Sequence, residues 1–394
     1  MNLNNICGNM KKTIFMVSLA MMAMVSCVND DVVQINKGQK IEFRTALDTR
    51  VAELTIADFD KFQLTALYDN NSELYFSDYF IKGSGTTVYA SETEHYWPAN
   101  EDLKFFAYAP VDLSGVSIDK REQLVKNFTP NTDVSNQVDF VTCFTVAGKD
   151  DASDGVVSLE FKHQLSQIGV VAFNSNSGYK IQVKAVRIKN VYPTGDFYFA
   201  SGGKDWDVNE DEELVSYEIS CLNEEEDPLL LDESNQSLMF STGNAMLIPQ
   251  TRLAWGPKDE EDETEIVSEG AEGEGDGELN GSVPETPQTA EDGSYIAFQI
   301  KVTTATGSLI YPMETDDEDG FGWVAIPFAF NWAPGYKYTY ECDFSNGVGV
   351  VAPDELEVTP GSSYNPGEIV YGSTITITPS VSSIGTTYTN EVDM

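Results

Sequence analysis

The sequence is poor in basic residues, histidine and cysteine, and each shortage excludes a class of function. Its 394 residues include 23 Lys and Arg against 64 Asp and Glu, which gives a formal net charge of −41 at pH 7. A surface of that sign repels nucleic acid, so we expect no nucleic-acid partner. With 2 histidines and 5 widely spaced cysteines, the chain has neither a zinc motif nor an even disulfide framework.

Catalytic motifs are also missing. The sequence contains no Gly-x-Ser-x-Gly, no phosphate-binding glycine-rich loop and no His-Glu-x-x-His. Carboxylates are so numerous that no pair stands out as a glycosidase acid and nucleophile. His163 falls on the apolar side of an alternating run and is predicted to be a core residue, and His95 is placed at a strand end. We therefore predict no catalytic residue, no cofactor and no enzyme.

Acidic clusters are the only candidates for an inorganic ligand. Residues 209–213, 224–227 and 316–320 each gather several carboxylates in turn-rich sequence. Hard cations such as Ca²⁺ need several oxygen ligands, but none of the clusters has the EF-hand spacing. We predict solvated loops there and no metal site.

The longest apolar run near the start is too short to cross a bilayer comfortably, which takes about 20 residues. Residues 13–25 follow two lysines and lead to Cys27. This order predicts that residues 1–26 contain a cleaved secretory signal and that translation begins at Met10. Residues 24–27 resemble a bacterial lipobox, so Cys27 is predicted to be acylated and to become the first mature residue. The alternative is an incidental thiol beside an ordinary signal peptide.

What the sequence does contain is a series of short alternating runs. Residues 157–165 alternate apolar and polar side chains, and residues 336–344 repeat the pattern. Polar turns separate the runs, which is typical of a β-sandwich and not of a βαβ fold. Residues 119–128 give the one weak helical signal in the first half. In residues 181–188 the apolar positions change parity, which predicts a β-bulge near Lys184–Ala185.

Length and turn content indicate two domains. After a lipidated tether in residues 27–40, an N-terminal β-sandwich is predicted for residues 41–155 and a C-terminal one for residues 156–394. The boundary lies at a polar, turn-rich stretch that ends at Gly155. Residues 258–293 contain 14 acidic residues and too little apolar surface to offset the entropy of ordering, so we predict a disordered insertion within the second domain.

Cysteine and tryptophan need separate interpretations. Cys143, Cys221 and Cys342 are predicted to be small buried hydrophobic residues. A set of tryptophans fits either sugar stacking or a sandwich core; it consists of Trp206, Trp255 and Trp332.

Five short motifs occur in a fixed order along the chain. They are Cys27 with its acidic follow-on, Trp97-Pro98 with Phe105-Phe106-Ala107-Tyr108-Ala109-Pro110, Phe161-Lys162-His163-Gln164-Leu165-Ser166-Gln167-Ile168, Leu247-Ile248-Pro249-Gln250, and Trp332-Ala333-Pro334-Gly335-Tyr336-Lys337-Tyr338. Together they resemble the fimbrillin family of Bacteroidota, the subunits of lipoprotein-derived pili. None of the motifs encodes a reaction.

The resemblance implies two tandem transthyretin-like (Greek-key) β-sandwiches and a place in a fimbrium on the outer membrane, held there by the lipid on Cys27. In stalk and tip subunits of the family, a protease cuts after an arginine beyond the first strand. The matching arginine is Arg50, with Arg44 second. A strand from a neighbouring subunit then fills the groove. Residues 372–394 are either that donor strand or the last strand of their own domain.

The resemblance therefore implies a structural or accessory (tip or minor) pilus subunit that contributes to adhesion, with a host or bacterial surface ligand. The long acidic insertion favours an accessory role, because a charged loop of that size crowds a repeating stalk. Two alternatives stay open. One is an uncleaved subunit that anchors the pilus through Cys27, and the other is a stand-alone glycan-binding surface lipoprotein.

Overall fold

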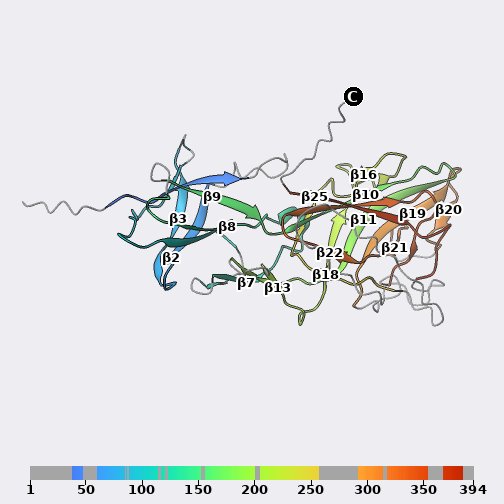
Figure 1. Ribbon diagram of the computed structural model, residues 1–394. Helices are drawn as coiled ribbons and strands as arrows, with labels where there is room; N and C mark the ends of the chain where they lie inside the picture. The colour runs from blue at the N-terminus through green and yellow to red at the C-terminus, as the bar shows by residue number, and fades with distance from the viewer. Residues whose placement is uncertain are drawn as a thin grey trace, which may run out of the picture.

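The computed structural model describes residues 38–47, 60–84, 86, 88–113, 117–119, 123–151, 156–199, 205–256, 292–313, 317–353 and 367–384. Within these ranges the regular elements are β-strands, apart from the 3₁₀ turn Val134–Asn136. The predicted all-β class is confirmed. Figure 1 shows an elongated molecule with one group of strands at each end and a small sheet below their junction.

The first group of strands closes into a barrel. In order around the ring, its strands are β1 (Glu42–Leu47), β4 (Val88–Ala90), β3 (Leu74–Lys82), β2 (Lys61–Tyr68), β5 (Leu103–Ala109), β8 (Val141–Ala147) and β9 (Val156–His163). Neighbouring strands are antiparallel except β1 and β9, which run parallel. Every second residue points inward, so the alternating runs of the sequence fill the barrel with apolar side chains.

The pairing of β9 bears on the division into domains. The sequence prediction placed Val156–His163 at the start of the second domain, but β9 pairs with β1 from Val156 to Phe161 and with β8 at Lys162 and His163. A boundary at Gly155 would separate β9 from both partners. The alternation of β9 shows that one face is buried, but it does not show which sheet the strand joins, because both partners are distant in sequence. The division at residue 155 stays a prediction.

The second group forms two facing sheets. One has the order β16 (Gln236–Ser237), β10 (Ser166–Phe173), β23 (Tyr336–Asp343) and β25 (Thr376–Ser383), with β17 (Ala245–Leu247) also on β10. The other has the order β14 (Val215–Ser220), β11 (Tyr179–Val191), β19 (Tyr295–Thr304), β21 (Gly322–Pro327) and β24 (Val350–Val351), with β15 (Leu229–Leu230) beside β11 and β20 (Leu309–Tyr311) beside β19. A two-stranded ribbon joins β18 (Thr251–Arg252) to β22 (Phe330–Asn331).

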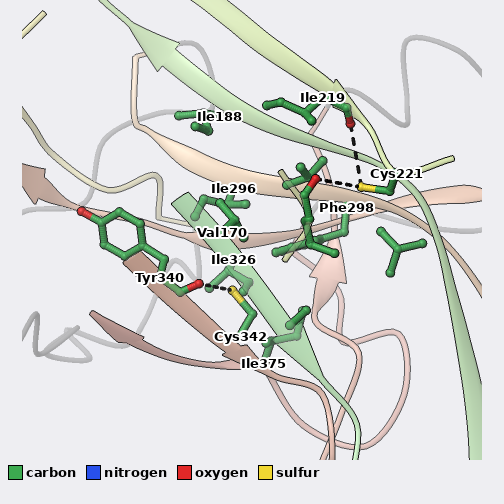
Figure 2. Close-up of a cluster of buried hydrophobic side chains, with 14 of the residues drawn as sticks. Val170, Ile188, Ile219, Cys221, Ile296, Phe298, Ile326, Tyr340, Cys342 and Ile375 are labelled. Atoms are coloured by element: carbon green, nitrogen blue, oxygen red, sulfur yellow. Dashed lines mark hydrogen bonds between the residues drawn. The ribbon is translucent and has the colours of Figure 1, made fainter. Parts of the chain in front are cut away.

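Side chains from both facing sheets make one core, part of which is drawn in Figure 2. Cys221 and Cys342 lie in it, and Cys143 lies in the barrel core; all three are buried and unpaired. The Cys221 thiol faces the carbonyl of Leu238 at 3.5 Å. Burial raises the pKa of Cys143 and of Cys221 to about 12, so both stay neutral. The prediction that these cysteines act as small hydrophobic residues is confirmed.

A small sheet connects the two groups of strands. It has the order β13 (Trp206–Val208), β12 (Gly195–Tyr198), β7 (Leu124–Phe128) and β6 (Ser117–Asp119), and therefore takes two strands from each half of the chain. The helix predicted for residues 119–128 is wrong. Pairing of β7 with the distant β12 overrides the weak local signal.

Aromatic rings fill the space between this sheet, the barrel and the sandwich. Phe197 is 2% exposed, and its ring centroid lies 5.3 Å from those of Phe140 and Trp206 and 5.2 Å from that of Phe199. The indole nitrogen of Trp206 donates to the carbonyl of Gln164, directly after β9. Because these groups come from both halves of the chain, the halves share one apolar core at their junction.

The predicted bulge is confirmed between Val183 and Ala185, where the register of β11 on β19 shifts by one residue. Its extra residue is Lys184, whose Nζ lies 2.7 Å from Oδ1 of Asp317 and 2.9 Å from Oδ2 of Asp319. Partial burial by itself raises the pKa of Asp317, but the hydrogen bond from Lys184 and the backbone N–H of Phe321 outweigh it and hold that pKa below its ordinary value.

The two ends of the acidic insertion meet. Trp255 donates its backbone N–H to the carbonyl of Ser294, and Ser294 donates in turn to that of Leu253. A Cβ on Gly293 would lie 2.4 Å from Cα of Trp255, so only glycine permits this approach. Most of the insertion, residues 257–291, lies outside the described residues.

The shared aromatic core predicts that the two halves of the chain unfold together. Phe197→Ala is expected to lower the free energy of unfolding by about 3–5 kcal/mol, because it removes a buried ring and leaves a cavity. Phe144→Ala is the matched control, because that phenylalanine is 40% exposed. Calorimetry of both variants measures the effect. Two separate transitions in the unmodified chain would contradict the shared core.

The Lys184–Asp317 ion pair predicts a pH-dependent contribution. Asp317→Asn is expected to cost about 1–2 kcal/mol of stability at pH 7. Because the pKa of Asp317 is depressed in the fold, its contribution is present above the unfolded pKa of about 3.9 and is lost as the pH falls through the folded value. Urea unfolding at several pH values should therefore show the deficit shrinking in acid.

A matched control for this measurement is Asp112→Asn. Asp112 pairs with Lys61 at 3.1 Å, but the two side chains are 83% and 47% exposed. An exposed pair contributes little, so this variant should resemble the unmodified chain at every pH. An equal loss in both variants would mean that the bulge pair has no special role.

Candidate functional site

The strand that closes the barrel is held on both sides. Residues 39–47 lie in what we call the β1 slot, between β9 on one side and residues 95–97 with β4 on the other. Six residues of β1 pair with β9, from Glu42 to Leu47. On the other side, Ile41 donates its N–H to the carbonyl of His95 at 2.8 Å, and Phe43 pairs with Tyr89. β1 is therefore an interior strand.

The β1 slot has an aromatic pocket at its centre. Phe43 is fully buried, and its ring centroid lies 4.8 Å from that of Phe80, 5.2 Å from that of Phe105 and 6.5 Å from that of Phe62, with interplanar angles of 78–90°. Edge-to-face packing of this kind adds about 0.5–1.5 kcal/mol per pair beyond the area buried. Ile41 fills the next inward position and is 2% exposed.

The sequence-predicted processing residues fall in different places. Arg44 lies inside β1, exposed, and pairs with Ser158 on one side and Val88 on the other. A protease needs an extended, accessible chain, so a paired strand is a poor place for a cut. Arg50 follows the end of β1 in the sequence and Cys27 precedes its start, and both lie outside the described residues. Both assignments stay predictions.

The C-terminal tail is described as far as residue 384. Within it β25 pairs antiparallel with the full length of β23, and among the described strands it has no second neighbour in the sheet. Ile375, just before β25, is buried, whereas Val381 is 36% exposed. β25 is thus an edge strand with one weakly buried face. In the described residues β25 therefore belongs to the same sheet as β23, and both predicted roles of the tail stay predictions.

The two histidines have structural partners. His163 Nδ1 lies 2.5 Å from Oδ2 of Asp139, and the two side chains are 8% and 11% exposed. His95 Nε2 lies 3.3 Å from Oδ2 of Asp78, and its ring stacks on Phe76 at 3.8 Å. Among the residues that the structure describes, each imidazole hydrogen-bonds to an aspartate, and neither hydrogen-bonds to a serine, threonine or cysteine side chain. The prediction that His163 is a core residue is confirmed.

The acidic clusters have partners of their own. The Lys184 ammonium donates hydrogen bonds to the carboxylates of both Asp317 and Asp319. In the cluster at residues 209–213, Glu212 accepts hydrogen bonds from Asn209 and Thr194. In the described part of the chain, no three acidic, histidine or cysteine residues converge as a metal site would require.

Tryptophan side chains offer no exposed platform for a sugar. All 5 are described, and each is buried: Trp97, Trp206, Trp255, Trp323 and Trp332. Trp332 stacks on Phe330 at 3.6 Å and donates to the hydroxyl of Tyr340, which fixes it in the sandwich. Of the two interpretations of Trp206, Trp255 and Trp332, the structure supports the sandwich core.

Sequence reasoning missed the partners of β1. The sequence predicted short strands in this half of the chain, but not that Phe62, Phe80 and Phe105 surround Phe43. That arrangement depends on the parallel pairing of β1 with β9, which begins more than a hundred residues later. No local signal specifies such a pairing. The described residues include no helix that is long and apolar enough to span a membrane.

Comparison with solved structures finds distant likenesses. A candidate cell adhesion protein from Bacteroides ovatus is 13% identical, with 88% of this chain and 98% of that one covered and a TM-score of 0.45. Another from Bacteroides uniformis is 12% identical, with 88% and 99% covered and a TM-score of 0.42. A third, from Parabacteroides distasonis, is 13% identical, with 87% and 96% covered and a TM-score of 0.45.

Comparison of the sequence gives the family. No curated protein matches it. Residues 49–360 match the model of a family described as fimbrillin-like, which spans most of the chain and includes the described strands from β2 to β24. The fimbrillin resemblance of the five motifs is confirmed, and with it a role in a pilus or in adhesion at the cell surface. The chain belongs to the fimbrillin-like family.

Proposed function

We propose that the chain is a structural or accessory (tip or minor) subunit of a cell-surface pilus, exported as a lipoprotein and assembled by strand exchange. The observation that supports this most is the position of β1. It is the first described strand, it closes the barrel, and the chain between it and β2 contains Arg50. One cut after that arginine would separate β1 from the rest of the chain and leave every other described strand intact.

Removal of β1 would leave a site with defined chemistry. β4 and β9 would both present unpaired backbone groups, and the pocket now filled by Phe43 would face water. An added strand satisfies the backbone groups along its length and covers the apolar slot. A closed barrel has no such edge. The subunit therefore stays protected against premature pairing for as long as β1 is in place.

Export and attachment follow from the start of the sequence. Acylation of Cys27 would hold the subunit at the outer membrane, with residues 27–40 as the tether. Cleavage after Arg50 would then release both the lipid and β1. The long acidic insertion favours an accessory position over a repeating stalk, because charged loops of this size repel their copies in neighbouring subunits. Two tandem transthyretin-like domains are part of the same proposal.

The main alternative is an anchor subunit that keeps its lipid and its first strand. An anchor subunit differs from the proposed one in that the peptide bond after Arg50 stays intact. A stand-alone glycan-binding lipoprotein has less support, because the tryptophans that motivated it are buried.

The intact mass of the surface-purified chain tests the proposal. We expect a mature chain that begins at Val51, and in the Arg50→Ala variant a chain that still carries acylated Cys27. Arg44→Ala is the matched control and should leave processing unchanged, because Arg44 lies within a paired strand. An acylated, uncut chain in the unmodified protein would support the anchor alternative and contradict strand exchange at this site.

A further inference from the structure

We infer that the β1 slot receives its strand from a different subunit, one with a large aromatic residue between two smaller inward-facing residues, and not from the C-terminal tail of another copy of this chain. This inference rests on the proposed strand exchange. It is argued from the shape of the slot and from the composition of the tail. The slot lies within the described residues, and so do residues 372–384 of the tail.

The slot has a specific sequence of inward positions. Ile41, Phe43 and Thr45 occupy them in turn, and the two hydrophobic side chains are buried to 2% and 0% exposure. The middle position is enclosed by three phenylalanine rings, each meeting Phe43 edge to face. A smaller residue there would leave a cavity in a close-packed interior, and the cost grows with the volume left empty.

The tail does not offer such a residue. The positions of one face of β25 and its approach are Ile375, Ile377, Pro379, Val381 and Ser383. Placed in the slot in either direction, this face brings an aliphatic residue, a proline or a serine to the aromatic pocket. The one aromatic residue of the tail is Tyr388, and with it in the pocket the neighbouring inward positions would be Thr386 and Asn390. Neither replaces the apolar contact of Ile41.

Proline gives a second, independent argument. Pro379 has no backbone N–H, and proline is therefore found on edge strands and is disfavoured in interior ones. In its own sheet β25 is an edge strand and Pro379 lies opposite Tyr340, so the missing donor does no harm. The β1 slot has a strand on each side. There the same proline would interrupt the ladder.

A strand-exchange experiment that starts from the uncut chain, with β1 (Glu42–Leu47) still in place, tests the inference. A protease recognition sequence is placed in residues 48–59, and the purified protein is cut there so that β1 stays bound without a covalent link. Fluorescent peptides are then added, and fluorescence anisotropy measures their binding. Mass spectrometry of the released segment confirms that each bound peptide has displaced β1.

Four peptides test what the aromatic residue and the absence of proline contribute to binding. A peptide of residues 38–47 is expected to exchange, and its Phe43→Ala version should bind about 100-fold more weakly. The tail peptide, residues 372–394, should bind at least as weakly as the Phe43→Ala peptide. The tail peptide with Ile377→Phe and Pro379→Ser, which supplies both missing features, should recover at least part of the affinity.

Each outcome has a distinct meaning. Equal binding of the tail peptide and the β1 peptide would overturn this inference and leave the proposed strand exchange intact, with the chain able to form a homopolymer. Failure of every peptide, the β1 peptide included, would overturn the proposed strand exchange and the inference together. A Phe43→Ala peptide that binds as well as the unmodified one would show that the aromatic pocket does not select the strand.

Discussion

The parallel pairing of β1 with β9 is the constraint on which the first half of the molecule depends. It joins the first described strand to the last strand of the barrel and so turns an open sheet into a ring without edges. The phenylalanine that β1 contributes completes an aromatic pocket built from three other strands. Backbone hydrogen bonds and apolar packing thus converge on six residues, and the same six residues would be the ones exchanged in a pilus.

Closure alone does not keep the two halves of the chain together. The small sheet that takes two strands from each half, and the rings packed beneath it, make the barrel and the sandwich continuous. The two halves are therefore joined by a packed apolar core.

The formal net charge is −41, and some of the carboxylates are paired with basic side chains of the same chain. The bulge in β11 adds one residue, and this residue is a lysine whose ammonium fills the turn at Asp317 and Asp319. Two carboxylates of this acidic cluster are therefore paired with a cation that the chain itself supplies. The backbone hydrogen bond from Trp255 to Ser294 brings the two ends of the acidic insertion together at one point on the sandwich.

Sequence alone was sufficient for the features that depend on local pattern. Alternation with a period of two determined the all-β class, the inward side of β9 and the burial of His163, because side chains on a strand point alternately to its two faces. The change of parity after Val183 located the bulge for the same reason. The five motifs were sufficient to identify the family.

Tertiary structure decided which strands pair. It placed β9 in the barrel, made strands of residues that carried a helical signal, and gathered Phe62, Phe80 and Phe105 around Phe43. Each of these outcomes depends on contacts between residues that are far apart in sequence. Local preference is worth less free energy than a full strand of backbone hydrogen bonds and a buried aromatic core, so the distant partners prevail. The candidate site is accordingly a property of the closed barrel, and no single stretch of the sequence contains it.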